Sequence, residues 1–366
     1  MSPEILEELS WYLRPAGGGV YLVSTGRAEQ QALQRRFYEA ESDADITERF
    51  LATLAGMEKA RVIVLGVPSD TGAGFRRGAN LGPAAIRQRL LDDDPHWNEH
   101  CRERGIIDIG DVFVVPQLLD DGMLNTEQLE RCRAALYPEV PAARRAALPV
   151  SPLSIAERAL ALALAAAPAA KPLVLGGDHS CAWPAVKALH DLGRRFCLVQ
   201  PDAHTDLLPE RLGVPMCFAT WTFHANQLLG ANGRVIEVGI RASRRDKQHW
   251  ESTLGVRQFW AEEIRQEPER LLEEVIRAVR ATQLPVYLSN DIDGTDDSVA
   301  DACGTPEPAG LEPEWLLTLI RRLGEEVGLV GADLMEVAPL LGADQGAKTL
   351  QVAASYVRAS LTALLA

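Results

Sequence analysis

Three short stretches of this 366-residue chain concentrate aspartate and histidine at spacings that suit metal binding. Their six candidate ligands are His179, Asp202, His204, Asp206, Asp291 and Asp293. Side chains on extended backbone alternate with a period of two, so Asp202, His204 and Asp206 can point in one direction. The same spacing separates Asp291 from Asp293. The pattern therefore predicts a cluster of carboxylate and imidazole groups.

The charge of this cluster indicates which ions it would hold. Its four carboxylates carry four negative charges, and burying them without compensation would be very costly. Two divalent cations would neutralise them, and a carboxylate-rich set with few imidazoles suits Mn²⁺ or a similar ion. Two such ions about 3.5–4 Å apart can share a bridging water and hold it as hydroxide against an electrophilic carbon. We therefore expect hydrolytic chemistry.

Each stretch also has a purely structural interpretation. The Gly-Gly-Asp-His sequence at 176–179 can be a turn. The Asp-x-Asp sequence at 291–293 can end a strand in solvent or cap a helix. The alternation at 202–206 is harder to explain in that way, and the convergence of all three stretches favours a functional site.

The elements that must position these residues are short apolar runs separated by helical segments. The runs lie at 61–67, 171–177, 195–201, 234–240, 285–291 and 327–333. The amphipathic segments include residues 82–91, 154–167, 268–282 and 313–327. Apolar strands alternating with helices predict a three-layer α/β/α fold, in which a mostly parallel sheet carries helices on both faces. Ligands bind outside the carboxyl ends of such strands, where all three stretches lie.

We expect two parts in the chain. Residues 1–59 have helical character and form an N-terminal leader, predicted to be a packed extension or an oligomer contact. Within it, residues 20–23 are a candidate short strand. Residues 60–366 show no dividing linker and are predicted to form one α/β catalytic domain, with loop-rich insertions at 92–100 and 119–139.

The composition excludes several classes of protein. The chain is 47% hydrophobic and 24% charged, as ordinary soluble proteins are. Its net charge of −14 argues against a nucleic-acid partner and against an anionic membrane surface. The N-terminus does not resemble a signal peptide, and the six cysteines show no metal or disulfide spacing. We therefore expect a cytoplasmic protein that acts on a small molecule.

Longer motifs around the three stretches resemble the ureohydrolase family of arginases, agmatinases and formimidoylglutamases. The matching motifs are Gly-Gly-Asp-His-Ser at 176–180, Asp-Ala-His-x-Asp at 202–206, Ser-x-Asp-x-Asp-x-x-Asp at 289–296, Gly-Thr-Pro at 304–306 and Asp-x-x-Glu-Val-x-Pro at 333–339. Residues 66–87 are similar to the family's first strand, loop and helix. The resemblance covers about residues 60–366 and implies an arginase-like fold.

The resemblance implies two Mn²⁺ ions per subunit, with Ni²⁺ as the next candidate. One ion would be held by His179, Asp202, Asp206 and Asp291, and the other by Asp202, His204, Asp291 and Asp293. Glu336 would accept hydrogen bonds from a guanidinium or amidine group. Asp206 would relay a proton to the departing amine. Family members assemble as trimers or hexamers, which implies a homotrimer or homohexamer.

The sequence departs from the family around residue 212. Leu212 stands where agmatinases and arginases carry a histidine, which formimidoylglutamases also lack. His224 is the nearest downstream imidazole, although a histidine there more often packs on a helix. Few polar groups follow the second motif, which disfavours an arginase proper. Glu210 is a candidate contact for a distal ammonium of the substrate and Arg211 for a distal carboxylate.

Three functions remain open. The function we favour is a binuclear amidinohydrolase that converts an agmatine-like guanidino compound to urea and an amine through a metal-bridging hydroxide. The second is a formimidoylglutamase-like hydrolase that releases formamide. The third is a non-catalytic metal-binding homologue. The six intact ligands together with Glu336 favour the hydrolases.

Overall fold

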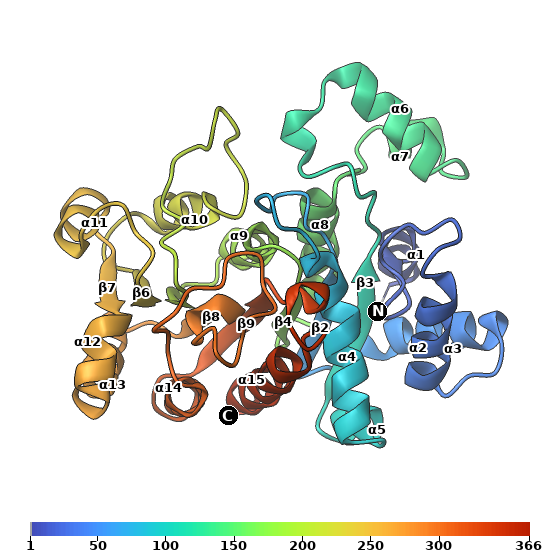
Figure 1. The fold of residues 1–366 in the computed structure, drawn as a ribbon. Coiled ribbons are helices and arrows are strands. Elements are labelled where there is room, and N and C mark those ends of the chain that lie inside the picture. Colours follow the sequence, from blue (N-terminus) through green and yellow to red (C-terminus); the bar gives the residue numbers. More distant parts are fainter. Residues whose placement is uncertain (1) are drawn as a thin grey trace.

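The computed structural model describes residues 2–366, and within them nine strands form one sheet (Figure 1). The strand order is β1-β3-β2-β4-β9-β8-β5-β6-β7. The strands are β1 (Leu13–Arg14), β2 (Val62–Val67), β3 (Ile106–Val112), β4 (Lys171–Gly176), β5 (Cys197–Pro201), β6 (Val235–Ile240), β7 (Arg257–Trp260), β8 (Val286–Asp291) and β9 (Leu329–Met335). Only the β1–β3 pair among these strands is antiparallel. The predicted mostly parallel sheet is therefore confirmed, and each of the six apolar runs contains all or most of a strand.

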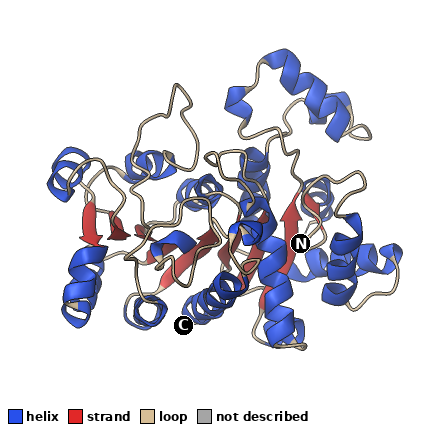
Figure 2. Ribbon diagram, in the orientation of Figure 1, coloured by secondary structure: helices blue, strands red, loops and turns tan. Residues whose placement is uncertain are grey.

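Helices cover both faces of this sheet and confirm the three-layer arrangement (Figures 1 and 2). One face packs against α4 (Gly82–Asp93), α13 (Pro268–Ala281), α14 (Pro313–Glu326) and α15 (Ala347–Leu365). The other packs against α8 (Pro152–Ala166), α9 (Trp183–Asp191) and α10 (Trp221–Leu229). The remaining helices of the domain are α5 (Trp97–Glu103), α6 (Thr126–Leu136), α7 (Ala142–Arg145), α11 (Lys247–Leu254) and α12 (Ala261–Gln266). Among the described helices, none is long and apolar enough to span a bilayer.

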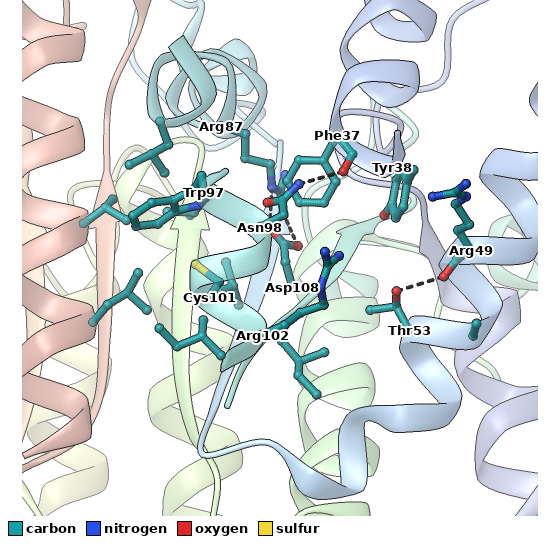
Figure 3. Close-up of a pocket in the computed structure, with 18 residues that line it drawn as sticks. Phe37, Tyr38, Arg49, Thr53, Arg87, Trp97, Asn98, Cys101, Arg102 and Asp108 are labelled. Atoms are coloured by element: carbon teal, nitrogen blue, oxygen red, sulfur yellow. Dashed lines mark hydrogen bonds and ion pairs between the residues drawn. The ribbon is translucent and has the colours of Figure 1, made fainter. Parts of the chain in front are cut away.

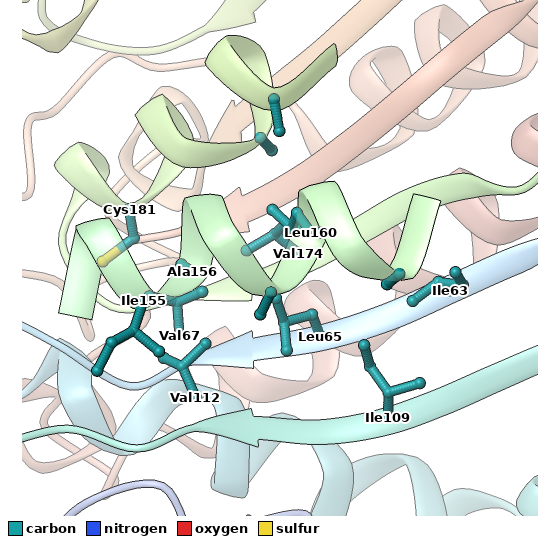
Figure 4. Packing of buried hydrophobic residues seen from close by; sticks show 14 of the residues in the cluster. Ile63, Leu65, Val67, Ile109, Val112, Ile155, Ala156, Leu160, Val174 and Cys181 are labelled. Atoms are coloured by element: carbon teal, nitrogen blue, oxygen red, sulfur yellow. The ribbon is translucent and has the colours of Figure 1, made fainter. Parts of the chain in front are cut away.

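The packing of α8 on the sheet shows how the core holds the central strands in place (Figure 4). Ile155 and Leu160 of α8 lie against the side chains of Val67, Val112 and Val174 on three neighbouring strands. All five side chains are fully buried. Burying each apolar side chain of this size contributes about 1.5–3 kcal/mol. This packing fixes β4, from whose end the first metal-binding stretch continues.

The leader packs against the edge of the sheet. It contains α1 (Pro3–Tyr12), α2 (Arg27–Tyr38) and α3 (Asp43–Gly56), and β1 pairs with β3. Leu9, Phe50 and Leu54 of the leader are buried in the same core cluster as strand β2. The division of the chain after residue 59 stays a prediction, since the leader shares this core.

Three local predictions were wrong. Residues 20–23 do not form a strand, because only Val20 makes a bridge, to Val114. The predicted loops at 92–100 and 119–139 contain much of α5 and all of α6. Helix α6 has no fully buried residue, but Asn125 and Gln128 form a capping box at its start. Its apolar residues Leu129, Cys132 and Leu136 pack half-buried against the core. This short apolar stripe and the capping box are the signals that the loop prediction overlooked.

Candidate metal centre

Four neighbouring strands, β4, β9, β8 and β5, bring the predicted site residues to one edge of the sheet. His179 lies in the turn after β4, and Glu336 directly follows β9. Asp291 ends β8, and Asp202 directly follows β5. These strands are parallel, so their carboxyl ends meet at the same edge.

The first group of ligands surrounds one nitrogen of His179. Its Nδ1 atom lies 3.1 Å from Asp202 Oδ2, 3.3 Å from Asp206 Oδ2 and 3.0 Å from Asp291 Oδ2. All four side chains are buried. The indole Nε1 of Trp221 donates a hydrogen bond of 3.1 Å to Asp206 Oδ2. His179, Asp202 and Asp206 offer donor atoms within 4.8 Å of one another, close enough to share one metal ion.

The second group consists of Asp202, His204 and Asp293, which also offer donor atoms within 4.8 Å of one another. His204 Nδ1 lies 3.1 Å from Asp293 Oδ2 and 3.7 Å from Asp202 Oδ1. The two oxygens of Asp202 therefore face different histidines. Because the groups share this carboxylate, the arrangement fits two neighbouring ions.

The hydrogen bonds of His179 indicate which of its ring nitrogens is free to bind a cation. Its Nε2 atom lies 3.1 Å from Ser289 Oγ, which donates to Asp333 Oδ1 at 2.9 Å. Since the serine proton is directed to Asp333, we assign the ring proton to Nε2, which donates to Ser289. The Nδ1 atom then points at three carboxylates and makes no hydrogen bond. That arrangement needs a positive charge, and the carboxylate and imidazole donors suit Mn²⁺.

The pKa values of His179 and His204 also show that this site favours positive charge. Burial lowers the pKa of His179, but the carboxylates of Asp202, Asp206 and Asp291 outweigh burial and raise it well above the ordinary histidine value. Burial also lowers the pKa of His204, whereas Asp293 and Asp202 raise it to about 12. Protons therefore bind here when metal ions do not, and the two compete.

Glu336 faces the ligand cluster from the end of β9. Its Oε1 atom accepts a hydrogen bond of 2.9 Å from the backbone N–H of His179, and its own N–H donates to Gly177 O at 2.8 Å. Its φ of 64° is left-handed, an uncommon conformation for a non-glycine residue. Burial, with the charges of Asp291 and Asp178, raises the pKa of Glu336 well above its usual range. A cation bound here would favour the ionised carboxylate.

A cavity of about 10 Å³ opens beside this glutamate. It is lined by Gly74, Phe75, Arg76, Phe218, Gly304, Thr305 and Glu336. The predicted substrate contacts lie on the exposed loop near this cavity, and Arg211 Cζ stacks 4.9 Å above the Phe218 ring. Glu210 is exposed and makes no hydrogen bond or ion pair within residues 2–366. Leu212 is fully exposed at a φ of 54°.

His224 does not reach the ligand cluster. Its Nε2 atom lies 2.7 Å from Pro215 O, and its ring packs against Trp183 and Phe223. This packing on α10 agrees with the interpretation that a histidine at this position packs on a helix.

Sequence reasoning missed several side chains that hold the ligands in place. Gln200 Nε2 donates to Asp202 Oδ2 at 2.7 Å, and Gln200 Oε1 accepts from Thr222 Oγ1 at 2.8 Å. Thr305 Oγ1 donates to Asp293 Oδ2 at 3.0 Å. Gln200 stands two residues before Asp202, so the strand period was a usable signal for it. Thr222 and Trp221 carried no comparable signal, because only the fold brings α10 to the site.

Comparisons with known proteins agree with this geometry. The model of the Arginase family matches residues 60–362. An agmatinase of Halalkalibacterium halodurans is 28% identical over 316 residues, which cover 85% of this chain and 95% of that protein. An N(1)-aminopropylagmatine ureohydrolase of Thermus thermophilus is 32% identical over 287 residues, covering 77% of this chain and 84% of that protein. The crystal structure of the agmatine ureohydrolase of Thermoplasma volcanium matches with a TM-score of 0.61 and 27% identity, covering 84% of this chain and 91% of that one. The chain belongs to the arginase family of ureohydrolases.

Proposed function

We propose that this chain is a binuclear metal-dependent amidinohydrolase that converts an agmatine-like guanidino compound to urea and an amine. As a ureohydrolase, it is an enzyme that cleaves C–N bonds of linear amidines. The observation that carries the proposal is the pair of ligand groups sharing Asp202, with Glu336 facing them. The substrate class rests on the similar agmatinase and aminopropylagmatine ureohydrolase.

The metal ligands are the six predicted residues. His179, Asp202, Asp206 and Asp291 would hold one ion, and Asp202, His204, Asp291 and Asp293 the other. Mn²⁺ is our first choice and Ni²⁺ our second, since imidazole and carboxylate suit both. When bound, such ions would lower the pKa of a nearby water and so supply a nucleophile at neutral pH.

The protein's own residues would orient the substrate and move the proton. Glu336 accepts N–H groups of the planar guanidinium, which places the central carbon opposite the ligand cluster. Burial and the charge of Asp202 raise the pKa of Asp206 to about 6. That shift belongs to the site without cations, and bound ions would favour the ionised carboxylate. Asp206 would relay a proton to the departing amine, whose departure requires protonation.

We expect a homotrimer or homohexamer in the cytoplasm that acts on a small-molecule guanidino or amidino substrate and binds neither nucleic acid nor membrane. Glu210 and Arg211 are proposed to contact the distal end of the substrate, since their loop reaches Phe218 at the cavity.

A formimidoylglutamase-like reaction is the second candidate. It is favoured by Leu212, which supplies no imidazole and points entirely into solvent. His224 offers no replacement, because it is bound to Pro215. A non-catalytic metal-binding homologue is the third candidate, and the opposed Glu336 argues against it.

Product analysis separates these candidates. Protein loaded with Mn²⁺ or Ni²⁺ is offered agmatine, guanidinobutyrate, arginine and formimidoylglutamate, and urea and formamide are both quantified. Urea from a guanidino compound is the expected result. Formamide from formimidoylglutamate would support the second candidate. No product from protein that carries two ions per chain would support the third.

A further inference from the structure

A cavity of about 270 Å³ lies between the leader and the catalytic domain (Figure 3). Its walls come from α2 and α3 of the leader, from α4, α5 and α15, and from strands β2, β3 and β4. None of the six predicted metal ligands lines it, and neither does Glu336. It is therefore separate from the metal centre.

The cavity has an apolar floor and aromatic walls. The floor residues Val64, Leu90, Ile106, Leu175, Val357 and Leu361 are all buried. Phe37, Tyr38 and Trp97 form the walls, and the first two rings pack edge to face at 5.1 Å. Aromatic side chains of this kind provide broad, rigid contact surfaces for a planar or aliphatic group.

One charged group in the cavity is already neutralised. Arg87 is almost fully buried and makes two hydrogen bonds to Asp108, of 2.8 and 3.0 Å. It also contacts Asp111. Asp108 itself is 17% exposed and lines the cavity. One guanidinium against two carboxylates leaves this ion-pair cluster with one net negative charge.

Two further guanidinium groups line the same cavity without a partner. Arg49 and Arg102 make no side-chain hydrogen bond or ion pair within residues 2–366. Asp45, one helical turn before Arg49, hydrogen-bonds to Ser42 at the start of α3 and interacts with Arg49 through its charge without forming an ion pair. Figure 3 shows the Arg102 guanidinium directed toward the Asp108 side and Arg49 on the α3 side. Three arginines against Asp108 and the adjoining Asp111 leave this cavity one formal positive charge in excess, in a chain of net charge −14.

We propose that this cavity binds a small organic anion. Its apolar or aromatic body would rest on the floor between Phe37 and Trp97, and its anionic group would face Arg49 and Arg102. An empty packing void is normally apolar, whereas this one carries four charged side chains. Ligand pockets span about 300–1,000 Å³, so a volume of about 270 Å³ suits a ligand of one or two rings.

The leader supplies part of this site, which gives residues 1–59 a role independent of the proposed reaction. Phe37, Tyr38, Arg49 and Thr53 all belong to the leader. The proposal does not depend on the substrate of the metal centre, so the two can fail separately.

Calorimetry with three ligands of one shape tests the proposal on the full, metal-loaded chain. The probes are naphthoate, neutral naphthylmethanol and cationic naphthylmethylamine. We expect saturable binding of naphthoate to one site, binding of the alcohol at least tenfold weaker, and no binding of the amine. The double variant Arg49→Gln/Arg102→Gln should bind naphthoate at least tenfold more weakly and the alcohol unchanged. Both side chains are exposed, so this variant is expected to fold.

Two further variants locate the binding. Arg131→Gln/Arg195→Gln removes the same charge from exposed arginines outside the cavity and should bind naphthoate like the wild type. Thr53→Trp places a ring at the cavity wall and should abolish binding of the anion. The proposal is overturned if the wild type shows no saturable naphthoate binding. It is equally overturned if both double variants bind naphthoate with the same affinity, because the ligand would then lie elsewhere.

Discussion

Asp202 connects the two halves of the metal centre. Its Oδ2 atom lies 3.1 Å from His179 Nδ1, and its Oδ1 atom lies 3.7 Å from His204 Nδ1. Asp206 joins His179 in one half and Asp293 joins His204 in the other. Asp291, 3.0 Å from His179 Nδ1, is proposed to bind both ions. A substitution in one half should therefore weaken the binding of one ion more than that of the other.

Replacing His204 by alanine should remove one of the two ions and retain the other. The group around His179 does not include His204, so its donor atoms stay in place. Metal content after dialysis, measured by plasma mass spectrometry, checks this expectation. His224→Ala is the control, because His224 binds Pro215 outside the cluster. Equal loss of both ions in the His204 variant would contradict the two-group assignment.

Ser289 should contribute to metal affinity without binding the metal. Its hydroxyl links His179 Nε2 to Asp333, which keeps Nδ1 directed at the carboxylates. Loss of such a supporting group costs about 10–100-fold in metal affinity. Titration calorimetry of Ser289→Ala with Mn²⁺ should show a Kd raised by that factor. Ser298→Ala removes an exposed hydroxyl bound to Asp296 and should leave Kd unchanged. Equal affinities of the two variants would show that Ser289 has no such role.

At the scale of elements, β5, β6 and β7 carry a row of buried polar residues. Glu237 on β6 pairs with Gln200 on β5 and Gln258 on β7. Its Oε2 atom accepts a hydrogen bond of 2.6 Å from Gln258 Nε2, whereas its Oε1 atom has no partner. Burial raises the pKa of Glu237 well above its usual value of 4.5. The folded protein therefore keeps this carboxyl group protonated at pH values where the unfolded chain ionises it.

This difference makes stability depend on pH in a definite direction. A raised folded pKa stabilises the fold fully below about pH 4.5, and the contribution is lost as pH rises toward the folded pKa. Glu237→Gln cannot ionise, so it should equal the wild type at pH 4 and exceed it at pH 8. The free energy of unfolding of the variant should exceed that of the wild type by about 1.4 kcal/mol for each pH unit over which the wild type loses stability. Chemical denaturation at both pH values measures it.

The matched control is Glu262→Gln, since Glu262 is exposed at the start of α12. Its stability should follow the wild type at both pH values. If Glu237→Gln also followed the wild type at pH 8, the carboxyl group would be ionised in the folded state.

The strands that consist of continuous apolar runs were predictable from the sequence. Strand β3, whose charged side chains pair with a distant helix, was not. β4 and β8 end at Gly176 and Asp291, and Asp202 directly follows β5, so the sequence pattern placed the candidate ligands at the ends of apolar runs. β3 interrupts its apolar pattern with Asp108 and Asp111, whose partner is Arg87 on α4. An ion pair between distant segments leaves no periodic signal. The link from Ser289 to Asp333 was hidden for a similar reason, because it depends on β8 lying beside β9.

At the scale of the whole molecule, the leader is part of the folded core. Phe50 of α3 is 4% exposed, whereas its neighbour Leu51 is 39% exposed. Phe50→Ala should lower the free energy of unfolding by about 3–5 kcal/mol. Leu51→Ala should change it by less than about 0.5 kcal/mol. Chemical denaturation compares the two, and equal effects would mean that the leader does not unfold with the domain.

The carboxylate of Glu336, which faces the ligand cluster, offers the most direct test of the proposed reaction. Glu336→Gln preserves the shape of the side chain but removes the charge that would pair with a guanidinium. Losing one partner of a buried charge pair costs about 2–5 kcal/mol, or at least about 30-fold in kcat/KM. The measurement is urea release from agmatine and guanidinobutyrate by wild type and variant, each with its metal content determined. We predict urea from the wild type and at least 30-fold less activity from a variant that retains both ions. Absence of urea from wild-type protein carrying both ions, or equal activity of the variant, would contradict the account.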